Sequence, residues 1–269
     1  MKNITWKSIV RISIWVLALT ALIVIFAFAS KRQSGMKCKS IKIQLLDSES
    51  FITSKQLMHL INKHHKLLFS RIDSLEIDTL ENRIRKNPFV DQVTVSVDLG
   101  GTLLVKVAQK HPVLLVSPLQ GKPYYIDRSG KKMPFAKYDS SHFYLAGGTI
   151  HEAFTKVDTL HSTGLKNLFI LTQYLNRYKK WKGIARALLL NESGEIEILP
   201  LNEPFRILIG DTSDLAEKFQ KLDILYTTIL PKEGINKYSL INLKYAGQLV
   251  CVRKEDSLEI NSHNKLSPQ

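Results

Sequence analysis

Residues 89–108 read FVDQVTVSVDLGGTLLVKVA and decide the fold of the first half of the chain. Valines alternate with polar side chains between residues 93 and 98, which is the period of two expected for a half-buried strand. Gly100 and Gly101 then give a hairpin turn signal, and TLLVKVA supplies the returning strand. The stretch therefore predicts an antiparallel β-hairpin with one face available for packing.

Upstream of this hairpin, the sequence predicts one strand and two helices. Residues 40–47 alternate like a short strand, and Thr53 with Gln56 forms a capping box that starts a helix. A second helix start lies at Asp73. The order strand, helix, helix, strand, strand predicts a small α+β unit over residues 40–110. Its expected core side chains are Ile43, Leu57, Leu60, Ile61, Leu80, Ile84, Val93, Val95, Val105 and Val107.

Downstream of the hairpin, residues 112–254 predict a mixed β domain with two longer helices. The strand candidates are VLLVS, the hairpin KPYYIDRSGKKMP, FYLAGG, IARALLL, EIEIL, FRILIG and a final strand. Helical patterns cover residues 158–181 and a segment that starts at Asp211 or Ser213 and is closed by Pro231. The fold class of the whole chain is therefore predicted to be α+β.

The N-terminal segment, residues 12–30, carries no charged side chain and is predicted to be a transmembrane helix. A helix over these residues is about 28 Å long, close to the thickness of the hydrocarbon layer. A cleaved signal peptide is the alternative, since Ala27-Phe28-Ala29 resembles a cleavage site, but the apolar run exceeds the usual length of about 7–15 residues. Residues 1–11 then form a short stub, and residues 255–269 a disordered tail.

The net charge of +14 is concentrated near this segment. Residues 1–39 carry seven Lys or Arg side chains and no acidic one, which is half of the excess. A nucleic-acid-binding protein is expected to gather its basic side chains in its folded part. The distribution instead favours contact with anionic lipid headgroups and argues against a nucleic-acid partner.

No residue combination predicts catalysis or metal binding. HEAFT at residues 151–155 comes nearest to a zinc-protease motif, but Thr155 stands where the second histidine is required. Asp127 precedes a Ser-Gly turn and is interpreted as a turn cap. Cys38 and Cys251 lie far apart and are interpreted as unpaired structural cysteines. We expect no enzyme activity, no cofactor, no metal and no small-molecule substrate.

Four motifs occur in an order that resembles a known family. They are NPFV at residues 87–90, TLLVKVAQKHPVLLV at 102–116, YYIDRSGKKMP at 124–134 and INLKY at 241–245. The chain resembles the bacterial cell-division family FtsQ/DivIB, with a POTRA domain followed by the family's β domain. Two departures are Gly100-Gly101, where the family often has proline, and Asn242 with Lys244, where it often reads Asp-Leu-Arg.

The resemblance implies a non-enzymatic scaffold that crosses the cytoplasmic (inner) membrane once. Its partners are expected to be small coiled-coil proteins of the FtsB and FtsL type, which regulate septal peptidoglycan synthesis. The N-terminus would be cytoplasmic, and residues 31–269 would lie in the extracytoplasmic or periplasmic space at the division septum.

The final strand is the expected partner-binding site. Residues 238–254 are interpreted as one strand whose edge pairs with an extended segment of an FtsB-like partner. Tyr245 is the expected aromatic anchor, and small residues beside it would allow a close backbone approach. The predicted site residues are Asn242, Lys244, Tyr245, Ala246, Gly247 and Leu249. In the alternative interpretation, AGQ at residues 246–248 turns a hairpin and the edge is filled internally.

Two other functional classes remain as alternatives. One is a single-POTRA component of a secretion or outer-membrane assembly system, although the sequence lacks the series of lipid-facing strands of a barrel. The other is a membrane-anchored cell-wall hydrolase, which would need a nucleophile or metal constellation that no motif supplies.

Overall fold

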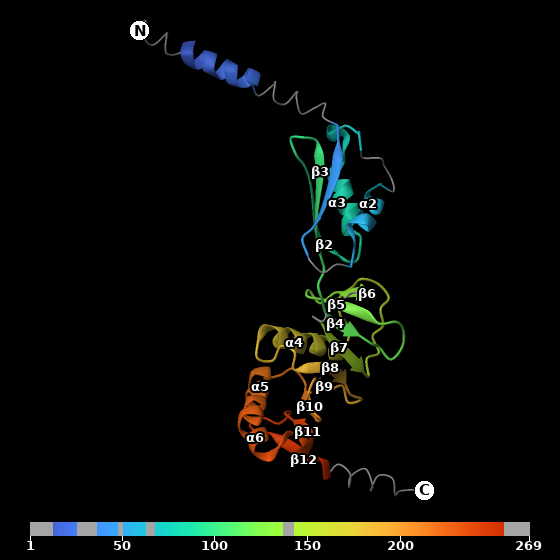
Figure 1. Cartoon of the computed structure of the whole chain (residues 1–269), viewed down its shortest axis with the longest axis vertical. Helices are drawn as coiled ribbons and strands as arrows, with labels where there is room; N and C mark the ends of the chain where they lie inside the picture. Colours follow the sequence, from blue (N-terminus) through green and yellow to red (C-terminus); the bar gives the residue numbers. More distant parts are fainter. Residues whose placement is uncertain (1–12, 26–36, 48–50, 63–67, 137–142, 256–269) are drawn as a thin grey trace, which may run out of the picture. The chain divides into compact units, whose positions relative to one another are not determined.

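The computed structural model describes residues 13–25, 37–47, 51–62, 68–136 and 143–255. They belong to two compact units, Met1–Gln109 and Lys110–Gln269, each with its own hydrophobic core (Figure 1). The predicted stub at residues 1–11, and all but the first residue of the predicted tail, lie outside the described residues.

The predicted anchor is described only in part. Residues 13–25 are helical, whereas residue 12 and residues 26–30 lie outside the described residues. Within the described part of the chain, no helix combines the length and the apolar character that a membrane crossing requires.

The first unit is a three-stranded sheet with two helices, as the sequence predicts. Its elements are β1 (Ser40–Leu45), α2 (Ser54–Asn62), the 3-10 turn η1 (Ile72–Ser74), α3 (Ile77–Arg85), β2 (Val90–Val97) and β3 (Thr102–Gln109). The sheet order is β1-β3-β2, with β1 parallel and β2 antiparallel to the central β3. Figure 1 shows α2 and α3 together beside this sheet.

The core of this unit confirms the predicted periodicity. Eight of the ten predicted core side chains are buried, and Ile43 and Leu60 are half-buried against them. The capping box also forms, because the Gln56 N–H donates to Thr53 Oγ1 at 3.3 Å and the Thr53 N–H donates to Gln56 Oε1 at 2.9 Å. The predicted start of the second helix at Asp73 is wrong. That residue lies in η1, and α3 begins at Ile77 after Glu76.

The second unit is built on one nine-stranded sheet. Its strands are β4 (Pro112–Val116), β5 (Tyr124–Asp127), β6 (Lys132–Pro134), β7 (Tyr144–Gly148), β8 (Ala185–Leu190), β9 (Ile196–Pro200), β10 (Arg206–Gly210), β11 (Tyr238–Asn242) and β12 (Val250–Arg253). The sheet order is β12-β11-β10-β9-β8-β7-β4-β5-β6. The pairs β4–β7, β7–β8 and β10–β11 are parallel and the remaining pairs are antiparallel.

Helices cover one face of this sheet (Figure 1). They are α4 (Thr163–Arg177), α5 (Leu215–Ile224), the π-helical turn η2 (Leu225–Ile229) and α6 (Leu230–Glu233), followed by the 3-10 turn η3 (Ile235–Lys237). Leucines of α4 and α5 share one core with the sheet. Phe219 of α5 lies 4.8 Å from Tyr174 and 5.3 Å from Trp181, measured between ring centroids, and so joins the two helices.

Both predicted ends of the first helix in this unit, and the predicted end of the last helix, are wrong. The first helix covers residues 163–177 rather than 158–181, because the backbone is extended at Ser162 and the chain after Tyr178 turns to bury Trp181. Pro231 does not close the last helix but lies at the start of α6, where a missing N–H costs little.

The Asp127 turn is confirmed, since Asp127 Oδ1 accepts hydrogen bonds from the N–H groups of Ser129 and Lys131, each at 2.9 Å.

The prediction of one continuous strand over residues 238–254 is wrong. β11 ends at Asn242, and β12 folds back beside it with Ile241 opposite Cys251. Two local features end the strand. Asn242 Oδ1 accepts the N–H of Lys244 at 3.0 Å, and Gly247 has a φ of 66°, a backbone conformation that glycine adopts at little cost. The hairpin alternative is therefore the correct interpretation, and the edge of β11 is filled by β12.

Candidate functional site

The two edges of the nine-stranded sheet differ. At one end, the outer side of β6 is covered by the chain's own residues. The Lys132 N–H donates to Asp158 O at 2.8 Å, and Lys131 pairs with Thr159 in an isolated antiparallel β-bridge. At the other end lies β12, and among the described residues no strand pairs with its outer side. An edge of this kind presents a row of N–H and C=O groups to which another chain can add a strand.

The loop between β11 and β12 is held by helix α5. Lys221 is buried, and its Nζ donates to Leu243 O at 3.1 Å and to Tyr245 O at 2.5 Å. One turn earlier, Glu217 Oε1 accepts the Gly247 N–H at 2.7 Å and lies 3.4 Å from Lys221 Nζ. The Gly247 hydrogen bond is the main reason that the pKa of Glu217 is lowered, with Lys221 adding to it. Helix α5 thus fixes the loop by three hydrogen bonds.

The strand end is fixed from a second direction, by the β8–β9 turn. Lys244 forms an ion pair with Glu195, which raises the pKa of Lys244 and lowers that of Glu195. The stem of Lys244 also lies over Gly210, where a Cβ atom would come within 2.7 Å of Lys244 Cγ. The Leu243 N–H donates to Leu208 O at 2.9 Å, and the Leu243 side chain is buried in the core.

The structure places the predicted site residues in different environments. Tyr245, Ala246 and Gly247 lie together in the exposed turn, and the Tyr245 side chain is 52% exposed. Asn242 is half-buried at the end of β11, and Lys244 is exposed beside Glu195. Leu249 packs against the core instead of continuing the face of Tyr245.

The strand at this end of the sheet, Val250–Arg253, was part of the predicted strand but was not among the predicted site residues. Val250 is exposed, whereas Cys251 packs against the core, so β12 presents one face to solvent and one to the protein. The burial of Cys251 raises the pKa of its thiol. The run LVCVR, together with the small residues before it, is the sequence signal that could have identified a separate edge strand.

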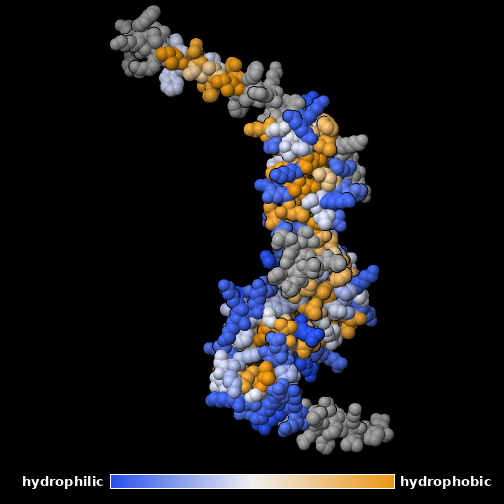
Figure 2. Space-filling view, viewed as in Figure 1, coloured by the Kyte–Doolittle hydropathy of each residue, from blue (hydrophilic) through white to orange (hydrophobic). Residues whose placement is uncertain are grey.

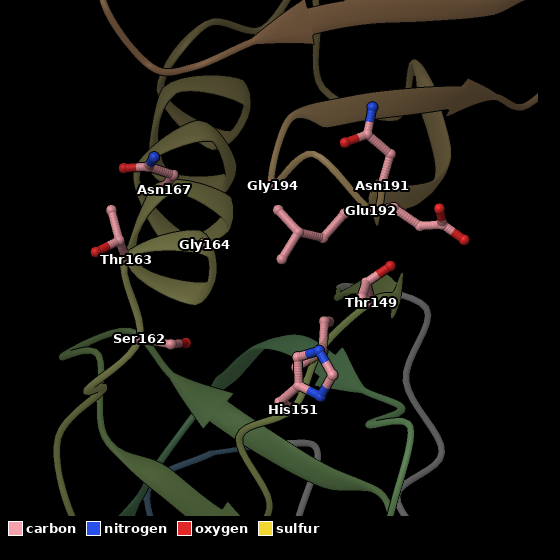
Figure 3. Close-up of a pocket in the computed structure, with 11 residues that line it drawn as sticks. Thr149, His151, Ser162, Thr163, Gly164, Asn167, Asn191, Glu192 and Gly194 are labelled. Carbon is pink, nitrogen blue, oxygen red and sulfur yellow. The ribbon is translucent and has the colours of Figure 1, made fainter.

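A second feature of this unit is a pocket lined by both apolar and polar side chains (Figure 3). It has a volume of about 310 Å³ and is lined by residues after β7, at the start of α4 and in the β8–β9 turn, including His151, Asn167 and Glu192. No group of three His, Cys, Asp or Glu side chains that could hold a metal ion occurs within the described ranges.

Glu152 of the HEAFT stretch has a structural role. Its carboxylate accepts the N–H of Ser162 at 2.7 Å at the start of α4, and it pairs with the buried Lys132 at 3.0 Å. Burial by itself would raise the pKa of Glu152, but the hydrogen bonds from the Ser162 N–H and Lys132 outweigh it, and the net shift is downward. Both contacts stabilise the charged carboxylate, which in turn holds the start of α4 in place.

Comparison with family models covers most of the chain. Residues 111–252 match the model described as FtsQ/DivIB, C-terminal related, and residues 36–108 match a POTRA-like domain. The chain belongs to the FtsQ/DivIB-like family. A comparison with curated proteins gave no match. Members of the FtsQ/DivIB-related family are generally non-enzymatic, and the family suggests a cell-envelope protein with a divisome-type role.

Proposed function

We propose that this FtsQ/DivIB-like chain is a single-pass membrane scaffold of the division septum that captures FtsB- and FtsL-like proteins by strand addition to β12. Residues 12–30 serve as the anchor, residues 40–110 and 112–254 as the two extracytoplasmic domains, and residues 255–269 as a tail. The observation that carries the proposal is the difference between the two sheet edges. The β6 edge is covered by residues 158–159, whereas no described strand pairs with the outer side of β12, the side away from β11.

The proposed partner segment would add main-chain hydrogen bonds to β12 and a side-chain anchor at the loop. Backbone bonds provide affinity without strict sequence demands, whereas an aromatic contact at Tyr245 contributes specificity. Because Lys221 and Glu217 already fix the loop, a partner would lose little free energy in ordering it. The alternative function in secretion or outer-membrane assembly has less support, because the second unit matches the FtsQ/DivIB C-terminal model.

A proline scan of the edge tests this proposal. Successive residues of a strand direct their N–H groups alternately to the two sides, so Val250→Pro, Cys251→Pro and Val252→Pro separate the two roles. A proline whose missing N–H faced β11 should lower the melting temperature. A proline whose missing N–H faced outward should leave melting almost unchanged and weaken capture about tenfold, equivalent to about 1.4 kcal/mol.

The matched controls are alanine at the same three positions, which removes the side chain but keeps the N–H. Binding is measured with a purified FtsB- and FtsL-like complex from the same cells, and septal localisation is followed with a fluorescent fusion. If every folded proline variant captures the complex with unchanged affinity, the binding site is not on β12, and the β1 edge of the first unit becomes the next candidate.

A further inference from the structure

The first unit has an unusual tip at the end where β1 begins. Three segments meet there through backbone hydrogen bonds. The Phe69 N–H donates to Cys38 O at 2.7 Å, the Cys38 N–H donates to Ser70 O at 2.9 Å, and the Lys39 N–H donates to Gly101 O at 2.8 Å. Residues 37–39 therefore lie between residues 68–71 on one side and the β2–β3 turn on the other.

This tip exposes large apolar side chains. Phe69 is 72% exposed and Leu99 is 90% exposed, and Leu68 is also exposed. Figure 2 shows hydrophobic and hydrophilic surface side by side at this end of the unit. A single exposed leucine needs no explanation, but three large apolar side chains on one small tip indicate a contact with an apolar phase.

The backbone of Phe69 supports this interpretation. Phe69 has a φ of 69°, in the left-handed region where glycine or asparagine is more stable than a bulky residue. Its side chain is mostly exposed, so packing inside the unit does not account for a phenylalanine at this position. An unfavourable backbone conformation that presents an aromatic ring to the outside points to a role for that ring outside the unit.

The charges at the tip match a lipid surface. Lys37, Lys39 and Arg71 are exposed here, as is the acidic residue Asp98 of the β2–β3 turn. The Asp98 carboxylate accepts the N–H groups of Gly100 at 2.9 Å and Thr102 at 2.8 Å, and these bonds lower its pKa. Basic side chains around exposed Phe and Leu are the pattern of an interfacial lipid contact.

We propose that this tip, formed by Leu68, Phe69 and Leu99 with Lys37, Lys39 and Arg71, inserts into the lipid headgroup layer. The apolar side chains enter the interface and the basic side chains contact anionic headgroups. The proposal rests on the proposed function only through the anchor, because residues 12–30 precede the tip closely enough to hold it at the membrane surface. Lipid contact fixes the orientation of the first unit relative to the membrane.

Fluorescence of the full chain in lipid vesicles tests the insertion. Phe69→Trp is introduced together with Trp6→Phe and Trp15→Phe, which removes signals from the anchor and leaves only the buried Trp181 as background. The matched control is Leu46→Trp, since Leu46 is also exposed, at 57%, but lies beyond the opposite end of β1, about 20 Å away along the strand. The vesicles contain phosphatidylcholine with or without phosphatidylglycerol, and brominated lipid serves as quencher.

We expect the vesicles to shift the Phe69→Trp emission to shorter wavelength and brominated lipid to quench it, and we expect both to leave the Leu46→Trp emission unchanged. Phosphatidylglycerol should strengthen the quenching, and Lys37→Glu with Lys39→Glu should abolish that increase.

An unquenched Phe69→Trp signal in a chain that floats with the vesicles overturns the insertion alone. A chain that does not float overturns the anchor and the insertion together. A Phe69→Trp signal that changes only when the FtsB- and FtsL-like complex is added also overturns the insertion and assigns the tip to a protein contact.

Discussion

The buried amine of Lys221 provides the sharpest test of how the β11–β12 loop is held. Lys221→Met keeps most of the apolar stem and removes the charged group that binds Leu243 O and Tyr245 O. Leu243 is buried, so its carbonyl loses its charged hydrogen-bond partner where water has little access. Leaving a buried polar group unsatisfied costs about 1–3 kcal/mol. We therefore expect the free energy of unfolding to fall by about 2 kcal/mol, which corresponds to about 4–8 °C in melting temperature for a domain of this size.

The matched control is Lys218→Met on the same helix. Lys218 is buried to a similar extent, but its Nζ donates to Asp211 O at 3.0 Å and Asp211 Oδ1 at 2.8 Å, away from the loop. Both variants should lose stability, whereas only Lys221→Met should accelerate amide hydrogen exchange at Gly247 and Gln248 and weaken capture of the partner complex. If the two variants show the same loop exchange and the same affinity, Lys221 does not organise the site.

Three further outcomes follow from individual contacts. Leu80→Ala should cost about 2–5 kcal/mol in thermal unfolding, because Leu80 is buried in the first core; unchanged melting would contradict that burial. Lys218 holds the pKa of Asp211 at about 2. The charged Asp211 therefore stabilises the fold, and Asp211→Asn should be less stable than the parent chain above about pH 4. This difference in the free energy of unfolding should disappear as the pH falls through 2, as measured by denaturation at each pH. Gly247→Ala should cost about 1 kcal/mol because φ is 66° there, and Gly247→Pro should cost about 3 kcal/mol because proline fixes φ near −65°; equal melting of both variants would refute the turn.

The local features of the fold were predictable because they arise within short windows of sequence. The β2–β3 hairpin, the Thr53 capping box and the Asp127 turn each depend on residues a few positions apart, and each is present. The core of the first unit follows from the periodicity of two for strands and 3.6 for helices. Helix ends were less predictable, since the start of α4 depends on Glu152, ten residues before Ser162.

The site itself depended on contacts that no local pattern contains. Lys221 and Tyr245 are 24 residues apart, and Glu217 and Gly247 are 30 residues apart. The alternation of residues 241–245 favoured a long strand, but the Asn242 side chain and the positive φ of Gly247 end it. Tertiary hydrogen bonds from α5 then fix the turn, so the predicted site residues other than Asn242 lie in a loop, and β12 forms the edge of the sheet.

The same contacts support the proposal that the four-residue strand β12 serves as a binding edge. A short edge strand is normally protected from non-specific pairing because few hydrogen bonds are available to an incoming chain. Here the strand begins three residues after Gly247, whose N–H is held by Glu217. A partner that pairs with β12 would therefore meet a backbone already fixed in position, with Tyr245 exposed in the loop that precedes the strand. In the proposed binding mode, selectivity arises from combining a few main-chain bonds with one aromatic contact, and a chain that offers only one of the two should bind weakly.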